Sequence, residues 1–276
     1  MAETTGTMTQ LPEAFTFSQS SLQDYAECPR RFQLRYLERL QWPAVESAPV
    51  LENERRQIEG QQFHRMVQQR LLGLPDEKLA RMANTPNLAR WWDSFLAHGP
   101  ALDGLTLRPE LSLAAPIGRH RLVAKYDLVA IGPGQALIFD WKTYHKRPLD
   151  AWMTARLQTK VYRALLVIAG TQLNGAKPFE PGQIEMEYWY PDFPAEPARL
   201  PYNAAIHQRD WQELLALVDA IAAERSFPMT EDEKKCAYCP YRSYCNRGTA
   251  AGETLDTESE IPDFEVNIEQ VQEIEF

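Results

Sequence analysis

The feature that most constrains how this chain can fold is a paired-strand segment, residues 125–142. Two runs of aliphatic, aromatic and β-branched residues, which favour strands, flank a Gly-Pro-Gly turn near its centre. If this turn closes a hairpin, Asp127 and Asp140 lie opposite each other on neighbouring strands. Side chains alternate between faces with a period of two, so Lys142 shares the face of Asp140. The segment therefore predicts that three charged side chains converge on one patch of a sheet.

This patch has the chemistry of a divalent-cation site. Two carboxylates that face each other across a sheet repel, and a bound cation would remove the conflict. Mg²⁺ and Mn²⁺ prefer oxygen ligands, and Mg²⁺ is commonly held by carboxylates together with water and phosphate. Such an ion polarises a phosphoryl group and lowers the pKa of bound water, while Lys142 would stabilise developing charge. The alternative is an ordinary cross-strand salt bridge, and a register slip of one residue would move Asp127 to the other face.

The rest of the pattern predicts an α/β protein in which helices surround an antiparallel meander. Helical periodicity is found in residues 52–73, 87–97, 150–169 and 207–225, after a first helical region that contains Pro29. Strands are expected in residues 105–116, 119–132, 135–144 and 183–192. The order of helices, meander, helix, strand and helix indicates one α/β or α+β core with a helical cover.

Charge divides the chain into a neutral body and an acidic tail. The chain has 29 Lys and Arg against 38 Asp and Glu, a net charge of −9. Residues 251–276 hold nine of the acidic residues and no Lys or Arg, so the acidity does not argue against a nucleic-acid partner for the body. We expect a flexible leader at 1–17 and a single domain at 18–250. The tail is either a disordered terminus, a docking segment for a partner, or a cover over a nucleic-acid groove.

No targeting or membrane segment is expected. No stretch approaches the roughly 20 apolar residues of a spanning helix. The N-terminal residues have neither a basic region nor an apolar region of the signal-peptide kind. We therefore expect a cytoplasmic protein without a membrane partner.

The four cysteines predict a second metal site. Cys236, Cys239 and Cys245 form a C-x₂-C-x₅-C cluster, and Cys28 lies far upstream. In a cytoplasmic chain, clustered cysteines indicate metal ligands before disulfides. Three local thiols and one remote thiol complete a four-cysteine site, which suits either a [4Fe–4S] cluster or structural Zn²⁺. Such a site would fasten the two ends of the domain and restrict the unfolded chain.

Taken in chain order, several short motifs resemble the RecB-type nucleases of the PD-(D/E)XK superfamily. The motifs are Gly60-x-x-Phe63-His64, Asp127 near a strand end, Asp140-Trp141-Lys142, and Gln158-x-x-x-Tyr162. The resemblance covers most of residues 18–245. It implies a restriction-endonuclease-like fold, in which a central mixed β-sheet is flanked by helices and a C-terminal cysteine segment closes onto an N-terminal helical region. It also implies cleavage of DNA phosphodiesters that depends on Mg²⁺ or Mn²⁺.

The resemblance assigns a role to seven residues. They are the metal ligands His64, Asp127, Asp140 and the backbone carbonyl of Trp141, the catalytic lysine Lys142, and the DNA-positioning pair Gln158 and Tyr162. The chain departs from the family pattern at Ala124, where members often have glycine. It has Asp140 where glutamate is also common, and neither departure removes a ligand. Glu110, on the preceding strand, is either a further metal ligand or an exposed carboxylate.

One branch of the RecB-type nucleases resembles this chain in its cysteines as well. That branch includes the CRISPR-associated exonucleases and the nuclease domain of AddB. It carries one cysteine before the nuclease core and three after it, and it binds a [4Fe–4S] cluster. Residues 25–32, around Cys28, and residues 236–245 are similar to its two cysteine elements. The resemblance therefore favours [4Fe–4S] over zinc and single-stranded DNA as the substrate.

Basic and aromatic side chains supply weaker candidates for DNA contact. They are Arg30, Arg31, Tyr36, Lys146, Arg147 and Lys160. The first three lie near Cys28 and would track a phosphate backbone and stack on a base. The alternative for that group is a basic helix face that pairs with local acids. The last three lie close in sequence to the Asp-x-Lys motif.

The sequence thus predicts a metal-dependent deoxyribonuclease, acting as a single-stranded DNA exonuclease in DNA repair, recombination or CRISPR-type DNA processing. No Walker A motif occurs in the sequence, so the chain is not itself an ATP-driven helicase. A helicase or a CRISPR adaptation protein would be a separate partner. One alternative is a non-catalytic DNA-end-binding or scaffold module with the same fold and a structural Fe–S or zinc site. Others are a zinc-stabilised protein-interaction domain and a nuclease that cuts RNA.

Overall fold

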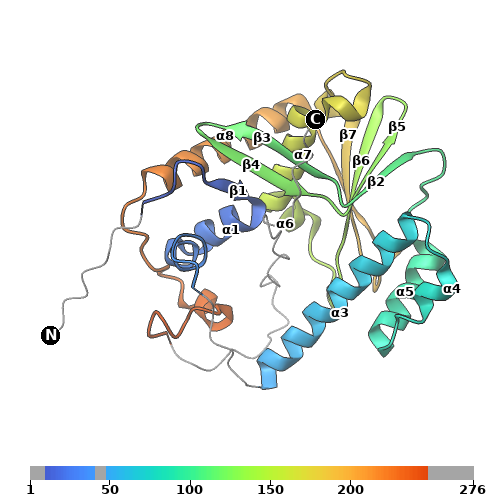
Figure 1. Ribbon diagram of the computed structural model, residues 1–276, viewed down its shortest axis with the longest axis horizontal. Helices are drawn as coiled ribbons and strands as arrows, with labels where there is room; N and C mark the ends of the chain where they lie inside the picture. Colours follow the sequence, from blue (N-terminus) through green and yellow to red (C-terminus); the bar gives the residue numbers. More distant parts are fainter. Residues whose placement is uncertain (1–9, 41–47, 248–276) are drawn as a thin grey trace.

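The computed structural model describes residues 10–40 and 48–247. Its strands form two mixed sheets, a three-stranded sheet of order β1-β4-β3 and a five-stranded sheet of order β2-β5-β6-β7-β8 (Figure 1). The strands are β1 Thr16–Ser18, β2 Thr106–Pro109, β3 Ser112–Ile117, β4 His120–Lys125, β5 Leu128–Gly132, β6 Gln135–Trp141, β7 Ile184–Trp189 and β8 Ala198–Pro201. This is the mixed α/β architecture expected for a restriction-endonuclease-like fold.

Helices surround these sheets. The α-helices are α1 Gln19–Glu27, α2 Pro29–Phe32, α3 Ala48–Leu71, α4 Asp76–Ala80, α5 Pro86–His98, α6 Asp150–Ala155, α7 Leu157–Ala169 and α8 Ala204–Ala223. A π-helical turn, η1, spans Gln33–Leu37, and short 3₁₀ turns are η2 Thr171–Asn174, η3 Pro181–Gln183 and η4 Glu233–Tyr238. No helix in residues 10–40 and 48–247 is long and apolar enough to cross a membrane.

The hairpin of β5 and β6 has the register expected from the sequence. Its turn is closed by Gln135, and its ladder ends where Leu128 pairs with Phe139. Continuing this register by one residue sets Asp127 opposite Asp140. β6 then pairs in parallel with β7, which makes the sheet mixed.

Two runs that we expected to be single strands are each broken between the sheets. Run 119–132 becomes β4 and β5, separated by Tyr126 and Asp127. Run 105–116 becomes β2 and β3, and the break lies at Glu110, whose φ of 55° is in the left-handed region. The meander is therefore shared by two sheets rather than forming one central sheet. The breaks matter for function, because one of them carries Asp127.

Other differences from the expected elements lie at boundaries and in short strands. The helix expected over 150–169 is divided into α6 and α7 by Arg156, whose ψ of 142° is extended. Residues 16 and 17, which we expected in the leader, belong to β1, and the Phe17 side chain is fully buried. β1 and β8 are three and four residues long, too short to show a period of two.

The five-stranded sheet is buried on both faces. On one face, residues such as Val129 and Ile138 pack against α1, α7, α8 and the three-stranded sheet. On the other face, Phe139, Trp141 and Trp189 pack against α3 and α5. Figure 1 shows α3, α4 and α5 grouped on the side away from α1. Burial on both faces explains the nearly continuous apolar runs in β5 and β6.

Candidate active site

Asp127 lies in the two-residue link between β4 and β5, at the end of the five-stranded sheet. Its Oδ2 accepts a hydrogen bond of 2.9 Å from the backbone N–H of Trp141. The same oxygen lies 3.2 Å from Nδ1 of His64, which α3 carries. A link residue has a backbone free of the ladder, so the carboxylate can turn toward the end of β6. Asp127 therefore ties the link, β6 and α3 together.

Asp140 lies in β6, and its side chain is only 3% exposed. Its Oδ1 lies 3.0 Å from Nζ of Lys142, an ion pair between residues two apart that share a face. Its Oδ2 accepts a hydrogen bond of 2.7 Å from Nε2 of Gln158 on α7. A buried charge of this kind is tolerated only when it is paired and hydrogen-bonded. Both partners that it requires are present.

The charges of these residues act on one another. Burial alone would raise the pKa of Asp127, but His64, the Trp141 N–H and Lys142 together hold that pKa below its usual range. Burial alone would lower the pKa of His64, but the charges of Asp127 and Asp140 raise it above its usual value. The four side chains predicted to act together are thus electrostatically coupled. They meet at the sheet end, where α3 from one face and α7 from the other both reach.

Gln158 and Tyr162, four residues apart on α7, have different contacts. Gln158 contacts the Asp140 carboxylate directly. The Tyr162 hydroxyl donates a hydrogen bond of 2.6 Å to the backbone carbonyl of Lys125, two residues before Asp127. The Tyr162 ring is buried, with its centroid 4.7 Å from that of Tyr126. In this arrangement Tyr162 supports the end of β4, and its contact with DNA stays a prediction.

Sequence reasoning missed Tyr188 of β7, which lies opposite Asp140 in the parallel register. Its ring centroid is 5.8 Å from Nζ of Lys142, and its hydroxyl lies 2.7 Å from Oγ1 of Thr159. Burial raises the pKa of Tyr188 far above its usual value, with a further contribution from Asp140. No local motif could have indicated Tyr188, because the pairing of β6 with β7 spans a long crossover.

Glu110 contacts the site through a backbone hydrogen bond. Its N–H donates a hydrogen bond of 3.0 Å to the carbonyl oxygen of Asp127. Its carboxylate forms an ion pair with Lys125. Glu110 therefore fixes the link that carries Asp127, and its carboxylate is engaged by a lysine. Its role as a further metal ligand stays a prediction.

The site contains the kinds of side chain that bind divalent cations. In this structure, however, its carboxylate oxygens contact other residues of the protein. As they stand, no three His, Cys, Asp or Glu residues in the described ranges converge closely enough to hold a metal ion. His64, Lys142, Gln158 and the Trp141 N–H lie next to the carboxylate oxygens. These donors satisfy the same oxygens that a cation would use. The two carboxylates are hard oxygen donors suited to Mg²⁺ or Mn²⁺, and the imidazole adds a borderline nitrogen donor.

The four cysteines line one small pocket, although about two hundred residues separate Cys28 from the other three. All four are free thiols. Burial raises the pKa of Cys239 to about 11 and also raises the pKa values of Cys236 and Cys245. Arg31 and Arg247 line the same pocket. The number and type of donors fit a four-cysteine metal site, although no three of these thiols converge closely enough to ligate a metal in this structure.

The basic candidates near Cys28 are engaged within the protein. Nη1 of Arg30 lies 3.2 Å from Glu38, and Nη2 of Arg31 lies 2.8 Å from Asp24. The ring of Tyr36 packs against the core, its centroid 5.3 Å from that of Phe32. These contacts correspond to the alternative given for Arg30, Arg31 and Tyr36, a basic helix face that pairs with local acids. Contact of these side chains with DNA stays a prediction.

The basic candidates near the Asp-x-Lys motif have different surroundings. Lys146 is exposed in the loop after β6. Arg147 forms an ion pair of 2.6 Å with Asp150. Lys160 forms an ion pair of 2.5 Å with Glu213 of α8, so its ammonium bridges two helices. Arg147 and Lys160 are thus paired with acids of the protein, and contact of these three side chains with DNA stays a prediction.

Comparison with known proteins identifies the family. A sequence model of the PD-(D/E)XK nuclease superfamily matches residues 16–246. No curated protein matches the chain at a significant level. Among solved structures, the chain is similar to the protein SSO0001, with 13% identity, a TM-score of 0.41 and coverage of 86% of this chain and 88% of that one. It is also similar to a protein from Eubacterium rectale described as a candidate exonuclease, with 12% identity, a TM-score of 0.45 and coverage of 76% and 84%. The superfamily match spans most of the chain and includes every residue of the site, so this chain belongs to the PD-(D/E)XK nuclease superfamily.

Proposed function

We propose that this protein is a deoxyribonuclease that uses Mg²⁺ or Mn²⁺ to hydrolyse phosphodiester bonds. The observation that carries the proposal is the end of the β5–β6 hairpin. There the register sets Asp127 opposite Asp140, and Lys142 lies 3.0 Å from the second carboxylate. Two carboxylates and a lysine at a sheet end match the chemistry that metal-assisted phosphoryl transfer requires. Membership of a nuclease superfamily supports the same conclusion.

Each site residue would have a separate role. Asp127, Asp140 and the neutral form of His64 would hold the metal, with the Trp141 carbonyl as a further oxygen ligand. The metal, when bound, would polarise the phosphoryl group and lower the pKa of a bound water. Lys142 would place its charge where the phosphate becomes more negative. Gln158 fixes the orientation of Asp140 through its hydrogen bond, so that carboxylate is preorganised.

The resemblance to the cysteine-bearing RecB-type nucleases indicates a substrate, a mode of action and a pathway. We propose single-stranded DNA as the substrate and exonuclease as the mode of action, in repair, recombination or CRISPR-type processing in the cytoplasm. A helicase or an adaptation protein would be the partner. The acidic tail, residues 251–276, lies outside the described residues, and a role for it in partner binding or in covering the DNA groove stays a proposal.

We also propose that Cys28, Cys236, Cys239 and Cys245 bind a [4Fe–4S] cluster, with Zn²⁺ as the alternative. The support is that four thiols from both ends of the domain line one pocket. Thiolates are the ligands of both metals. The nearby Arg31 and Arg247 side chains would offset part of the negative charge of four thiolates.

The test is cleavage of end-labelled single-stranded and double-stranded DNA by anaerobically purified protein. The reaction is run with Mg²⁺, with Mn²⁺ and with EDTA, beside D140N and the control D93N. Asp93 is exposed on α5 and is not one of the proposed site residues, so D93N removes an equal charge outside the site. We expect metal-dependent cutting in the wild type and D93N that D140N loses, with the label reporting polarity. Absence of cutting by folded, metal-loaded protein would contradict the proposal and favour the non-catalytic DNA-end-binding module.

A further inference from the structure

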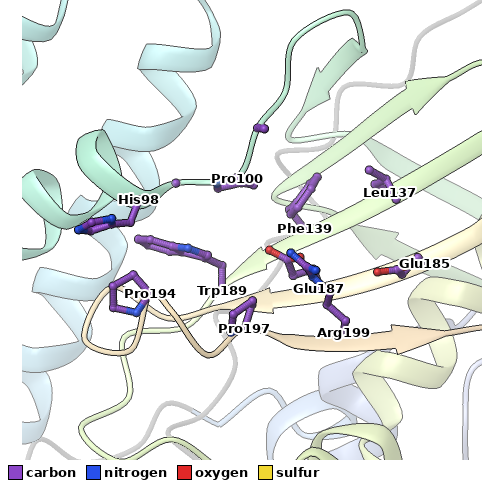
Figure 2. Close-up of a pocket in the computed structure, with 12 residues that line it drawn as sticks. His98, Pro100, Leu137, Phe139, Glu185, Glu187, Trp189, Pro194, Pro197 and Arg199 are labelled. Carbon is purple, nitrogen blue, oxygen red and sulfur yellow. The ribbon is translucent and has the colours of Figure 1, made fainter.

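A cavity lies on the face of the five-stranded sheet opposite Asp140. It encloses about 340 Å³, within the range of small-ligand pockets. Its apolar lining consists of Leu137 and Phe139 of β6, Trp189 of β7, and the prolines Pro100, Pro194 and Pro197 (Figure 2). Leu137 and Phe139 alternate with Asp140 along β6, so the sheet itself separates this cavity from the candidate active site. The prolines make part of its wall rigid before any ligand binds.

The charged lining of the cavity has an excess of carboxylate. Figure 2 shows Glu185 and Glu187 of β7 at the cavity together with Arg199 of β8. Nε of Arg199 lies 2.8 Å from Oε2 of Glu187, whose side chain is 11% exposed. Glu185 forms no hydrogen bond or ion pair with any residue in the described part of the chain. One guanidinium therefore serves two carboxylates, and His98 is the remaining titratable group in the lining.

The register of the sheet explains why Glu185 lacks a partner. Its neighbours across the strands are Leu137 on β6 and Pro201 on β8. Neither neighbour carries a charge, whereas Glu187 lies opposite Arg199. The fold thus leaves a partly exposed carboxylate beside an apolar floor, with only the charge of Arg199, which is already paired with Glu187, to offset it.

The charge of the lining decides which occupants suit it. Phosphate groups of a nucleic acid would be repelled by the excess carboxylate charge of the lining. The chain's own acidic tail, residues 251–276, would be repelled for the same reason. A metal ion lacks ligands here, because the lining offers only His98, Glu185 and Glu187, and Glu187 is already paired with Arg199. An organic cation with an apolar stem fits both the charge and the floor.

We propose that this cavity binds an arginine side chain from a basic segment of a partner protein. The guanidinium would form a two-pronged hydrogen bond with Glu185, as planar guanidinium groups do with carboxylates. The stem of the arginine would lie on Phe139 and the prolines, and residues beside it would fill the rest of the cavity. Arg199 of the lining already pairs its guanidinium with Glu187, so Glu185 is the carboxylate left for a second guanidinium. The inference concerns the other face of the sheet and does not rest on nuclease activity.

The experiment titrates full-length protein with a capped tetrapeptide that contains two arginines and with its citrulline counterpart, which is neutral and of similar shape. Binding is followed by the NMR signal of the Trp189 indole, assigned with W189F. We expect the arginine peptide to shift this signal in a salt-sensitive way and the citrulline peptide to leave it unchanged. We expect E185Q to weaken binding about fivefold, the effect of one partly exposed charge pair.

The control is E77Q, which removes an exposed carboxylate from α4. E77Q should bind the arginine peptide as the wild type does, and E185Q should melt at the wild-type temperature because Glu185 has no partner to lose. Equal binding of the arginine and citrulline peptides would overturn the proposal, and so would equal weakening in E185Q and E77Q. Spermidine binding as tightly as the arginine peptide would overturn the assignment to a polypeptide.

Discussion

At the scale of single residues, the two aspartates of the site have the same side chain and different surroundings. Asp127 is 19% exposed and receives the Trp141 N–H and His64. Asp140 is 3% exposed and is paired with Lys142. Asp127 is therefore the carboxylate that solvent reaches, while Asp140 is held rigid by its ion pair and by Gln158.

The first prediction concerns Lys142. K142Q removes the positive charge and keeps a polar side chain of similar length beside Asp140. Because the charge would act mainly in the transition state, we expect the cleavage rate to fall by about 10²–10³-fold, a loss typical of one stabilising donor. Single-turnover cleavage of labelled DNA measures this rate. Metal binding should persist in K142Q, so equal loss of cleavage and of metal affinity would contradict the assigned role.

The sequence predicted the residues of the hairpin better than their neighbours. Asp127, Asp140 and Lys142 follow from one turn and the period of two, both of which are local. Tyr188 and Lys160 do not, because their directions depend on how β7 and α8 pack against β6 and α7. Side chains within a hairpin can thus be placed from sequence, while contacts across a crossover require the structure.

At the scale of elements, α7 connects the site to the rest of the fold. One side of α7 carries Gln158 to Asp140, and another carries Arg163, which forms an ion pair of 3.0 Å with Asp210 of α8. Both side chains of this pair are at most 1% exposed. The guanidinium of Arg163 also lies 4.5 Å from the centroid of the Tyr202 ring. The pair therefore fixes how α8 packs behind the helix that orients Asp140.

The second prediction follows from this pair. D210A leaves the Arg163 charge buried without its carboxylate, so we expect the free energy of unfolding to fall by about 3–5 kcal/mol. Urea denaturation measures it. The double variant R163M/D210L should recover much of the loss, because it removes both charges at once. R209A is the control: Arg209 is exposed and also contacts Asp210, so its loss should cost no more than about 1 kcal/mol. A D210A loss as small as that of R209A would contradict the prediction.

The elements themselves show where sequence patterns succeed and fail. α5 matches its expected range closely and is capped by Thr85. The β5–β6 hairpin has the expected turn and register, because its turn residues are clear. The hydrophobic pattern did not predict the breaks at Glu110 and at Asp127, although the family resemblance placed Asp127 near a strand end. The apolar pattern continues through both breaks, and the change of sheet is decided by packing between distant strands. Patterns of hydrophobicity locate strands without assigning them to sheets.

At the scale of the whole molecule, the cysteine pocket joins the two ends of the described domain. Cys28 directly precedes α2 as its N-cap, and Thr230, far along the chain, donates its backbone N–H to Cys28 Sγ at 3.4 Å. The spacing of the cysteines predicted that such ends would meet, because ligation of one metal requires it. The metal itself could not be chosen from spacing, since iron–sulfur clusters and zinc both accept four thiolates.

The third prediction tests this closure. C28A removes the one remote ligand of the proposed iron–sulfur cluster, so we expect this variant to contain no iron and to show no visible absorption. Because a metal cross-link of this span restricts the unfolded chain, we expect the free energy of unfolding to fall by at least about 2 kcal/mol. Metal analysis and thermal melting measure the two effects. Retention of iron by C28A, or iron loss without any change in melting temperature, would contradict the cross-link.

The central claim is that Asp127 and Asp140 hold one divalent cation at the end of the β5–β6 hairpin. The measurement that tests it most directly is calorimetric titration of the full-length protein with Mn²⁺, compared with D127N, D140N and the control D93N. We predict one site in the wild type and in D93N, and loss of that site in each of the other two variants. Mn²⁺ binding that is unchanged in D127N and D140N would contradict the claim, whatever nuclease activity the protein has.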